Sequence, residues 1–220
     1  MASVLPPNPD DHPAKAAGPG RPKDLGKRAA ILEAAKGLFS HDGYARTSMD
    51  QIAAEAGVSK LTVYSHFGDK EALFGAAVHA RVQELLPDTL FEVERKGPLR
   101  EQLLAIGNSF VTLVTGEEAI NTHRMMIMPG NADDPLRRLF WEAGPQRTHA
   151  AMAEFLRARA AAGELVITDI ERASGQFFTL LKGERYSRLM CGLADAPDCE
   201  EISGHVQATV DLFLAAYAPR

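Results

Sequence analysis

The sequence predicts an all-α protein in which three short N-terminal helices precede a larger helical domain. Apolar residues recur three and four positions apart along most of the chain, which is the period of amphipathic helices. Alternation typical of strands is limited to one short candidate at residues 165–168. Glycine and proline, the strongest breakers of regular structure, divide this pattern into segments of helical length.

The overall composition is that of a globular protein without a membrane span. Of the 220 residues, 45% are hydrophobic and 24% are charged, and the formal net charge is −5. Such a charge argues against wrapping nucleic acid over the whole surface, although a local basic face stays compatible with it. No apolar run approaches the about 18 to 20 residues that span a bilayer, and no signal-peptide core is present. We therefore expect a soluble, cytoplasmic protein with no membrane partner.

Composition and charge divide the chain into three predicted parts. Residues 1–22 are rich in proline and poor in large apolar side chains, so we expect a disordered arm. Residues 21–70 carry eight basic and six acidic side chains, whereas residues 71–220 carry 15 and 21. This asymmetry suggests a small basic domain over residues 23–70 and a larger acidic domain over residues 71–220 with a separate task.

The helices of the small domain are predicted from their capping residues. Gly43 suits a left-handed C-cap of the first helix, and Gly57 breaks the second. A fourth helix begins at Lys70, and Pro87 kinks or ends it. The expected N-caps are Asp24, Ser48 with its neighbour Thr47, Ser59 and Asp69.

The larger domain is expected to contain helices only. Pro145 is expected to kink the longest of them. Their predicted ranges are residues 98–115, 117–128, 134–161, 169–190 and 199–217.

The second and third helices, joined by the turn at Gly57, have the outline of a helix-turn-helix motif. In that motif apolar packing holds the second helix so that its opposite face enters the major groove. Ile52, Val63 and Phe67 would supply the packing here. The outward face then offers side chains that reach base edges and phosphates, namely Lys60, Leu61, Thr62, Ser65 and His66, with Tyr64 at its edge.

Residues 43–74 carry a specific resemblance to a known family. The run GYARTSMDQIAAEAGVSKLTVYSHFGDKEALF closely resembles the DNA-binding domain of the TetR family of transcriptional regulators. The remainder of the chain resembles that family weakly. Residues 137–193, with Phe140–Trp141–Glu142 and Gly183–Glu184–Arg185, are similar to the C-terminal domain of its AefR-like subgroup.

The resemblance implies that residues 23–70 bind double-stranded DNA with a palindromic operator sequence. It implies that Thr47 bonds a phosphate through its hydroxyl and backbone N–H, and that Tyr64, His66 and Lys70 hold phosphates. Leu61 departs from the small residue frequent at this position, and it either packs on a thymine methyl or shields the turn. The DNA-binding residues implied are Arg46, Thr47, Ser59, Lys60, Leu61, Thr62, Tyr64, Ser65, His66 and Lys70.

The segment Gly20–Arg21–Pro22–Lys23 precedes the first helix and resembles the core of an AT-hook. An extended Arg-Pro element fits a narrow minor groove, whose negative potential attracts arginine. The alternative is a solvated linker with isolated charges. Arg21 and Lys23 are therefore candidate DNA contacts. The sequence leaves open whether they enter the minor groove or belong to a solvated linker.

The last two predicted helices each carry a stripe of apolar residues three and four positions apart. These stripes form either a closed core within one chain or a surface that packs against a second copy. Two copies of such a helix pair form a four-helix bundle across a two-fold axis, and the family resemblance implies that arrangement and a homodimer. The predicted interface consists of Phe177, Leu181, Ile202, Val206, Val210, Phe213, Leu214 and Tyr217.

The middle helices supply large apolar residues that either fill an ordinary core or line a ligand pocket. Methionine clustering at residues 125–128 favours an adaptable cavity. His123, Arg124, Arg147 and His149 are polar groups that either orient a ligand or are solvated. The candidate pocket residues are Phe110, Leu113, Met125, Met126, Phe140, Trp141, Met152, Phe155 and Phe178.

No catalytic or metal-binding pattern is found in the sequence. The seven histidines include no His-x-x-x-His pair, and none has a cysteine at zinc spacing. Cys191 and Cys199 are read as redox partners or, more simply, as two unrelated thiols. Carboxylate pairs such as Glu117–Glu118, Asp133–Asp134 and Glu200–Glu201 fall at predicted helix starts, where they stabilise the macrodipole. We expect no enzyme activity, no metal and no cofactor.

The sequence therefore predicts a transcriptional regulator that binds a palindromic operator as a homodimer and responds to a small-molecule effector. Release of a repressor by its effector is the mechanism favoured. An activator, or a regulator that binds DNA with its ligand, is the alternative within the same class. A helical ligand-binding or assembly protein whose helix-turn-helix is only a packing module is the alternative from a different class.

Overall fold

The computed structural model describes residues 24–92, 97–128 and 135–219, and in these ranges the chain is all-α with no strand. The predicted fold class is confirmed. In chain order the helices are α1 (Leu25–His41), α2 (Met49–Glu55), α3 (Lys60–Phe67), α4 (Lys70–Leu85), the 3-10 helix η1 (Asp88–Leu90), α5 (Leu99–Thr115), α6 (Glu117–Ile127), α7 (Pro135–Ala143), α8 (Pro145–Ala161), α9 (Ile170–Met190) and α10 (Cys199–Tyr217).

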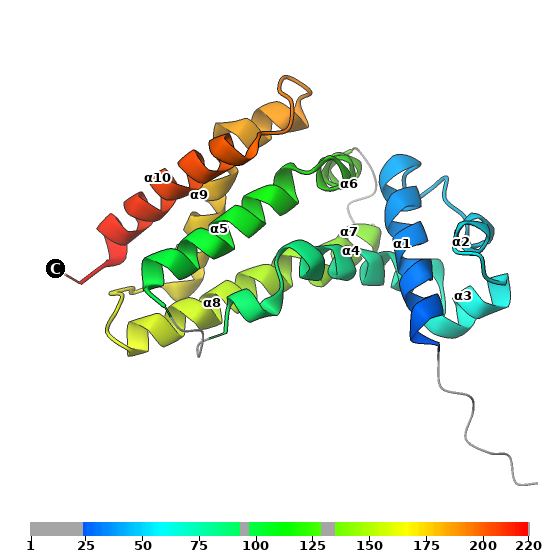
Figure 1. Ribbon diagram of the computed structural model, residues 1–220, viewed down its shortest axis with the longest axis horizontal. Coiled ribbons are helices and arrows are strands. Elements are labelled where there is room, and N and C mark those ends of the chain that lie inside the picture. The colour runs from blue at the N-terminus through cyan, green and yellow to red at the C-terminus, as the bar shows by residue number, and fades with distance from the viewer. Residues whose placement is uncertain (1–23, 93–96, 129–134, 220) are drawn as a thin grey trace, which may run out of the picture.

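Helices α1 to α3 form a head at one end of the molecule (Figure 1). Each begins at a side chain that accepts backbone N–H bonds: Asp24 for α1, Ser48 for α2 and Ser59 for α3. In the turn between α2 and α3, Gly57 has a φ of 64°, a conformation that favours glycine. The predicted caps therefore set the ends of these helices.

Helix α4 connects the head to the rest of the chain, which we call the body. Asp69 caps α4, and Leu73 and Phe74 in its first half are buried in the head core. Leu86, just after its end, is buried in the body core. The other main side chains of the head core are Ile31, Ala35, Phe39, Met49, Ile52 and Val63.

The body is a bundle in which α5 packs against both α9 and α10, and α8 packs against α9 (Figure 1). Gly107 on α5 permits the close approach of α10, because a Cβ atom there would lie 2.6 Å from Cγ1 of Val206. The body core includes Leu103, Ile106, Phe110, Met152, Phe155, Leu156, Phe177, Phe178, Val206, Val210 and Phe213.

Five of the eight residues of the predicted dimer stripe lie inside this core, which corrects the assignment of those five. Phe177, Leu181, Val206, Val210 and Phe213 are at most 2% exposed. Their side chains fill the space between α5, α9 and α10 within one chain, so they have no surface left for a partner. The remaining members, Ile202, Leu214 and Tyr217, are partly buried against the same core.

Two further predictions about local structure are corrected. The expected helix over residues 134–161 is two helices, α7 and α8, separated at Gly144, whose φ and ψ of −124° and −85° are not helical. Pro145 starts α8 rather than kinking it, as its missing N–H allows. Residues 165–168 form no strand, although the N–H of Val166 donates to the carbonyl oxygen of Tyr217 at 2.7 Å.

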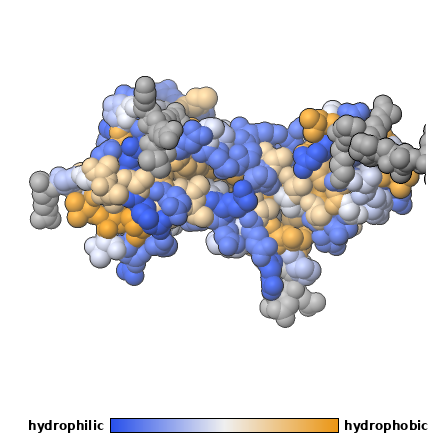
Figure 2. All heavy atoms as spheres, turned by 90° about the horizontal axis from the view of Figure 1, so that it is seen from below, coloured by the Kyte–Doolittle hydropathy of each residue, from blue (hydrophilic) through white to orange (hydrophobic). Residues whose placement is uncertain are grey.

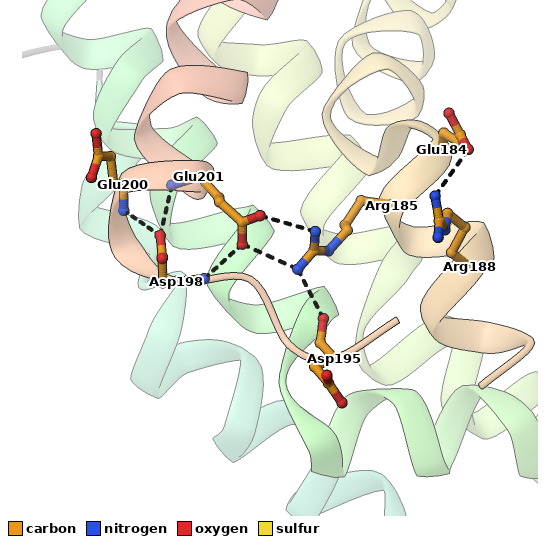
Figure 3. A network of polar contacts seen from close by, with 7 residues as sticks. All are labelled: Glu184, Arg185, Arg188, Asp195, Asp198, Glu200 and Glu201. Carbon is orange, nitrogen blue, oxygen red and sulfur yellow. Dashed lines mark hydrogen bonds and ion pairs between the residues drawn. The ribbon is translucent and has the colours of Figure 1, made fainter. Parts of the chain in front are cut away.

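Helix α9 is interrupted at Gly183, whose φ and ψ are 54° and −166°. The segment after the break is tied to the start of α10 by the Arg185 guanidinium, which bonds both carboxylate oxygens of Glu201 and the carbonyl oxygen of Asp195 (Figure 3). Glu201 also accepts from the N–H of Asp198, the N-cap of α10. Glu200 and Glu201 thus lie in the first turn of α10, as expected, and Glu201 caps the helix together with Asp198.

Within the described residues, no single helix is long and apolar enough to cross a membrane. The α5–α6 pair passes that test only when the two helices, inclined at 64°, are joined. Most of the face in Figure 2 is hydrophilic with smaller apolar areas between polar side chains.

Candidate DNA-binding face and ligand cavity

Helix α3 is held by one face and exposes the other. Val63 is fully buried in the head core, and Phe67 is partly buried against it. Lys60, Tyr64 and Ser65 are exposed, and Leu61 is 79% exposed. The face expected from the sequence to point outward does so, with Thr62 and His66 half-buried at its margins.

Short-range contacts order the polar groups of this face. The Lys60 ammonium lies 2.9 Å from a carboxylate oxygen of Asp50 on α2, and this bond raises the Lys60 pKa. The hydroxyls of Ser59 and Thr62 are 2.8 Å apart, and Ser65 donates to the Thr62 carbonyl oxygen. These contacts are all at the surface, where DNA can replace them at small loss.

Thr47 directly precedes the N-cap of α2, as expected, but its hydroxyl and N–H are bonded within the protein. Its side chain is 2% exposed, and its hydroxyl donates to the carbonyl oxygens of Leu38 at 3.1 Å and Gly43 at 2.9 Å. Its N–H also bonds the Gly43 carbonyl oxygen. In the free protein Thr47 therefore closes the turn between α1 and α2.

Lys70 lies at the first position of α4, with its ammonium 4.2 Å from the centre of the Tyr44 ring. Burial lowers the Lys70 pKa, because the ammonium is partly withdrawn from water. Arg46 is exposed, and its Nε donates to the Asp42 carbonyl oxygen at 2.7 Å. Arg46 therefore lies in the turn between α1 and α2, and Lys70 follows α3 closely in the chain. The candidates Arg21 and Lys23 lie outside the described residues.

A cavity of about 120 Å³ lies where the head meets the body. Phe39 of α1 and Phe74 of α4, both in the head core, line one side. Phe110 of α5 and Thr148 of α8 line the other. The wall of the cavity is mostly apolar, as in sites that bind small molecules.

Three of the nine predicted pocket residues line this cavity: Phe110, Leu113 and Phe140. Met125 and Met126 pack against the head core instead, and the Met125 sulfur accepts from the Tyr44 N–H at 3.3 Å. Trp141 is 52% exposed. Met152, Phe155 and Phe178 are fully buried in the body core behind the wall. The methionine cluster thus joins α6 to the head rather than forming a pocket.

The polar groups of the wall differ in their partners. Lys36 pairs with Glu33 and Glu84, and Nε of Arg81 lies 3.0 Å from Glu118. The ammonium of Lys182 lies 5.1 Å from the centre of the Tyr186 ring. It forms no ion pair with any of the described residues.

Two histidines face the same cavity. Burial, assisted by the charge of Lys182, lowers the pKa of His123 from 6.5 to about 4, and it lowers that of His149 as well. Of the other polar candidates, Arg124 donates to the Met190 carbonyl oxygen at the end of α9 and does not line the cavity. Arg147 is exposed.

Several wall residues were missed by sequence reasoning. Lys36, Phe39 and Phe74 were absent from the candidates, as were Arg81 and Lys182. Lys36 and Phe39 lie on α1 and Phe74 lies on α4, and no periodic pattern in the sequence reveals that α1 reaches this cavity. Lys182 had one available signal, a lysine within an otherwise apolar stretch of α9.

The comparisons with known proteins cover both parts of the chain. A model described as bacterial regulatory proteins of the tetR family matches residues 31–77. A model described as the C-terminal domain of AefR-like transcriptional repressors matches residues 101–219. This protein belongs to the TetR family. Both resemblances drawn from the sequence are confirmed, and the chain is a DNA-binding transcriptional regulator of a non-enzymatic family.

Solved structures resemble this TetR-family regulator over most of its length. A putative TetR-family regulator from Mesorhizobium loti is 27% identical with a TM-score of 0.75, covering 90% of this chain and 100% of that one. The flavonoid-responsive regulator FrrA is 33% identical with a TM-score of 0.68 and the same coverage. SmeT in complex with triclosan is 25% identical with a TM-score of 0.63, covering 88% and 92%.

Curated relatives match this chain over less than half of their own length. The repressor TetR of Mycobacteroides abscessus is 38% identical over 79 residues, which are 36% of this chain and 40% of the relative. The activator FasR of Mycolicibacterium smegmatis is 32% identical over 88 residues, 40% of each chain. The match spans 39% of the regulator BetI of Agrobacterium fabrum, so this chain covers well under two thirds of the length of these relatives. No group of three or more potential metal ligands is found in the described residues.

Proposed function

We propose that this TetR-family regulator binds a palindromic operator as a homodimer and is released from it by a small aromatic effector. The observation that carries the proposal is the cavity between head and body, lined by α1 and α4 on one side and by α5 and α8 on the other. FrrA is named for its response to flavonoids, and SmeT is described with triclosan, which supports an aromatic effector.

The cavity connects effector binding to the position of the head. Phe74 and Leu86 embed the two ends of α4 in different cores, so α4 follows movement between head and body. A ligand that contacts both sides favours one relative position over the other. Release follows when that position no longer places both heads on successive major grooves, which are about 34–36 Å apart.

The dimer surface we propose is the outer face of α9 and α10. Leu180 on α9 is 39% exposed and Leu212 on α10 is 57% exposed, and both border a groove between the two helices. Exposed small residues on the same face of α10, four and eight positions apart, permit the close approach of a second copy: Gly204, Ala208 and Ala216. Two heads joined in this way read both halves of a palindrome.

Base reading is assigned to the exposed face of α3. Leu61 shields little of the turn, because 79% of it is exposed, and this favours the thymine-methyl role between its two alternatives. Lys60, Thr62 and Ser65 supply the neighbouring hydrogen-bonding groups, and Tyr64, His66 and Lys70 are the proposed phosphate contacts.

The experiment that tests this function is selection of bound fragments from random duplex DNA by the purified full-length protein at low salt. The expected result is one palindrome with half-sites about one helical turn apart. Leu61→Ala should relax the preference at a thymine position. Recovery of no enriched sequence, with or without small aromatic compounds, would overturn the proposal.

An activator is the second candidate, because the matched relatives include the activator FasR. Transcription in vitro from a promoter that carries the selected palindrome separates the two. A repressor lowers transcript yield, whereas an activator raises it.

A further inference from the structure

Among the described residues, Lys182 differs from the other cations of the cavity wall in having no ion-pair partner. Lys36 is neutralised by Glu33 and Glu84, and Arg81 pairs with Glu118. The ammonium of Lys182 lies near the Tyr186 ring, and no carboxylate of the described residues pairs with it. A half-buried ammonium without an anion is costly, because burial removes its hydration without replacing it.

The groups around Lys182 add hydrogen-bonding capacity without adding charge. His123 and His149 line the same part of the wall, and burial keeps the pKa of each below its usual value. Each ring is neutral at neutral pH and offers one N–H donor and one acceptor nitrogen. The burial that affects these rings also lowers the pKa of Lys182. A bound anion would reverse that effect on the lysine by favouring its charged form.

The rest of the cavity suits an aromatic ring. Phe39, Phe74, Phe110 and Phe140 line it, together with small aliphatic side chains such as Val78. Within the described residues, the cavity wall therefore combines apolar side chains with one cation that has no ion-pair partner, Lys182, and with two neutral imidazoles.

We propose that the cavity binds an aromatic acid, with the ligand's anionic group paired with the Lys182 ammonium and its ring lying among Phe39, Phe74, Phe110 and Phe140. This inference rests on the proposed effector response and narrows its ligand class. The charge-assisted bond distinguishes an acid from a neutral compound of the same shape.

Lys182 also connects this recognition to the proposed dimer surface. It lies on α9 immediately before the break at Gly183, and two residues after Leu180. An anion bound to Lys182 therefore contacts α9, and the outer face of α9 packs against the second copy in the proposed dimer.

The test compares two probes of nearly identical shape, cinnamate and cinnamamide, for binding to the full-length protein by calorimetry at neutral pH. Cinnamate should bind the wild type about tenfold or more tightly than cinnamamide. Lys182→Met should abolish this preference while leaving the affinity for cinnamamide within about twofold. Lys182→Arg keeps the charge and should retain the preference.

Lys27→Met is the matched control, because it removes a lysine on α1 that does not line the cavity. It should leave the preference for cinnamate unchanged. Equal affinities for the two probes in the wild type, binding of neither, or a preference that survives in a folded Lys182→Met protein would each overturn the inference.

Operator binding by the unliganded protein is measured in parallel. A protein that binds its selected palindrome but shows no preference for cinnamate would contradict the aromatic-acid assignment alone. A protein that prefers cinnamate through Lys182 but selects no DNA sequence would instead contradict the proposed function.

Discussion

The imidazole of His205 on α10 bridges the break in α9, with its Nε2 atom 2.9 Å from the carbonyl oxygen of Leu181. The same nitrogen lies 3.2 Å from the carbonyl oxygen of Leu180. These contacts satisfy carbonyl groups beside the break at Gly183. His205 therefore stabilises the interruption from the neighbouring helix.

Gly183→Ala tests whether the break is required. The backbone at Gly183 has φ and ψ of 54° and −166°, a region almost restricted to glycine, and an added Cβ would lie 3.0 Å from Cε1 of His205. We expect a loss of about 1–3 kcal/mol in the free energy of unfolding, measured by urea denaturation.

Gly37→Ala is the matched control for Gly183. Gly37 lies within α1, and an added Cβ would meet nothing within 4 Å. This variant should be more stable than the wild type by about 0.5–1 kcal/mol. Equal effects of the two alanines would show that the break in α9 carries no conformational requirement.

Thr47→Val tests the position of Thr47 in the turn between α1 and α2. Loss of the bonds to Leu38 and Gly43 should lower the free energy of unfolding by about 1–2 kcal/mol. Operator affinity of the folded protein should stay unchanged, because the hydroxyl is buried and already bonded. A drop in affinity without a drop in stability would restore the phosphate role that the family resemblance implied.

Lys70→Ala should lower operator affinity without lowering stability, which is the opposite of the result expected for Thr47→Val. Removing this ammonium should weaken binding to all sequences alike and reduce the salt slope by about one. Stability should change little, since the Lys70 ammonium stacks on the Tyr44 ring face and its partial burial is unfavourable to its charge. Arg157→Ala on α8, which removes a body cation paired with Glu154 and Glu171, should leave the salt slope unaltered.

Leu212→Asp tests the proposed dimer surface. A carboxylate in the centre of an apolar helix–helix contact would be left unpaired, so we expect monomers by sedimentation velocity. Leu25→Asp, at an exposed position on α1, should remain dimeric. A dimer of undiminished stability in Leu212→Asp would place the interface elsewhere.

The buried His123 predicts how stability depends on pH. Its pKa is lowered from 6.5 to about 4, so between these values the unfolded chain binds a proton that the folded chain does not. The free energy of unfolding should therefore fall as the pH falls from about 6.5 to about 4, by up to about 3 kcal/mol from this group.

The contribution of His123 is isolated by comparing variants. His123→Gln should flatten this part of the curve of unfolding free energy against pH. His41→Gln removes an exposed histidine and serves as the control for losing any histidine. A curve for His123→Gln that parallels the wild type would show that His123 binds its proton equally in both states.

The head could be predicted almost completely from the sequence. Its helix ends depend on local side-chain bonds, such as those of Asp24, Ser48 and Ser59, and on the positive φ of Gly57. Interactions between residues so close along the chain leave a direct pattern in the sequence. The exposed face of α3 follows from the same pattern, because Val63 fixes its rotation.

The sequence by itself determined the helical class, the capping of the head and the family. Only the tertiary structure decided which apolar stripes close on each other and which remain exposed. Val206 and Val210 have the pattern of an interface helix, yet Gly107 on α5 lets α10 approach closely enough to bury them. The ligand cavity depends likewise on residues far apart in the chain, Phe39, Phe110 and Lys182 among them. Such choices rest on the packing of whole helices, because hydrophobic periodicity marks a buried face without naming the surface that covers it.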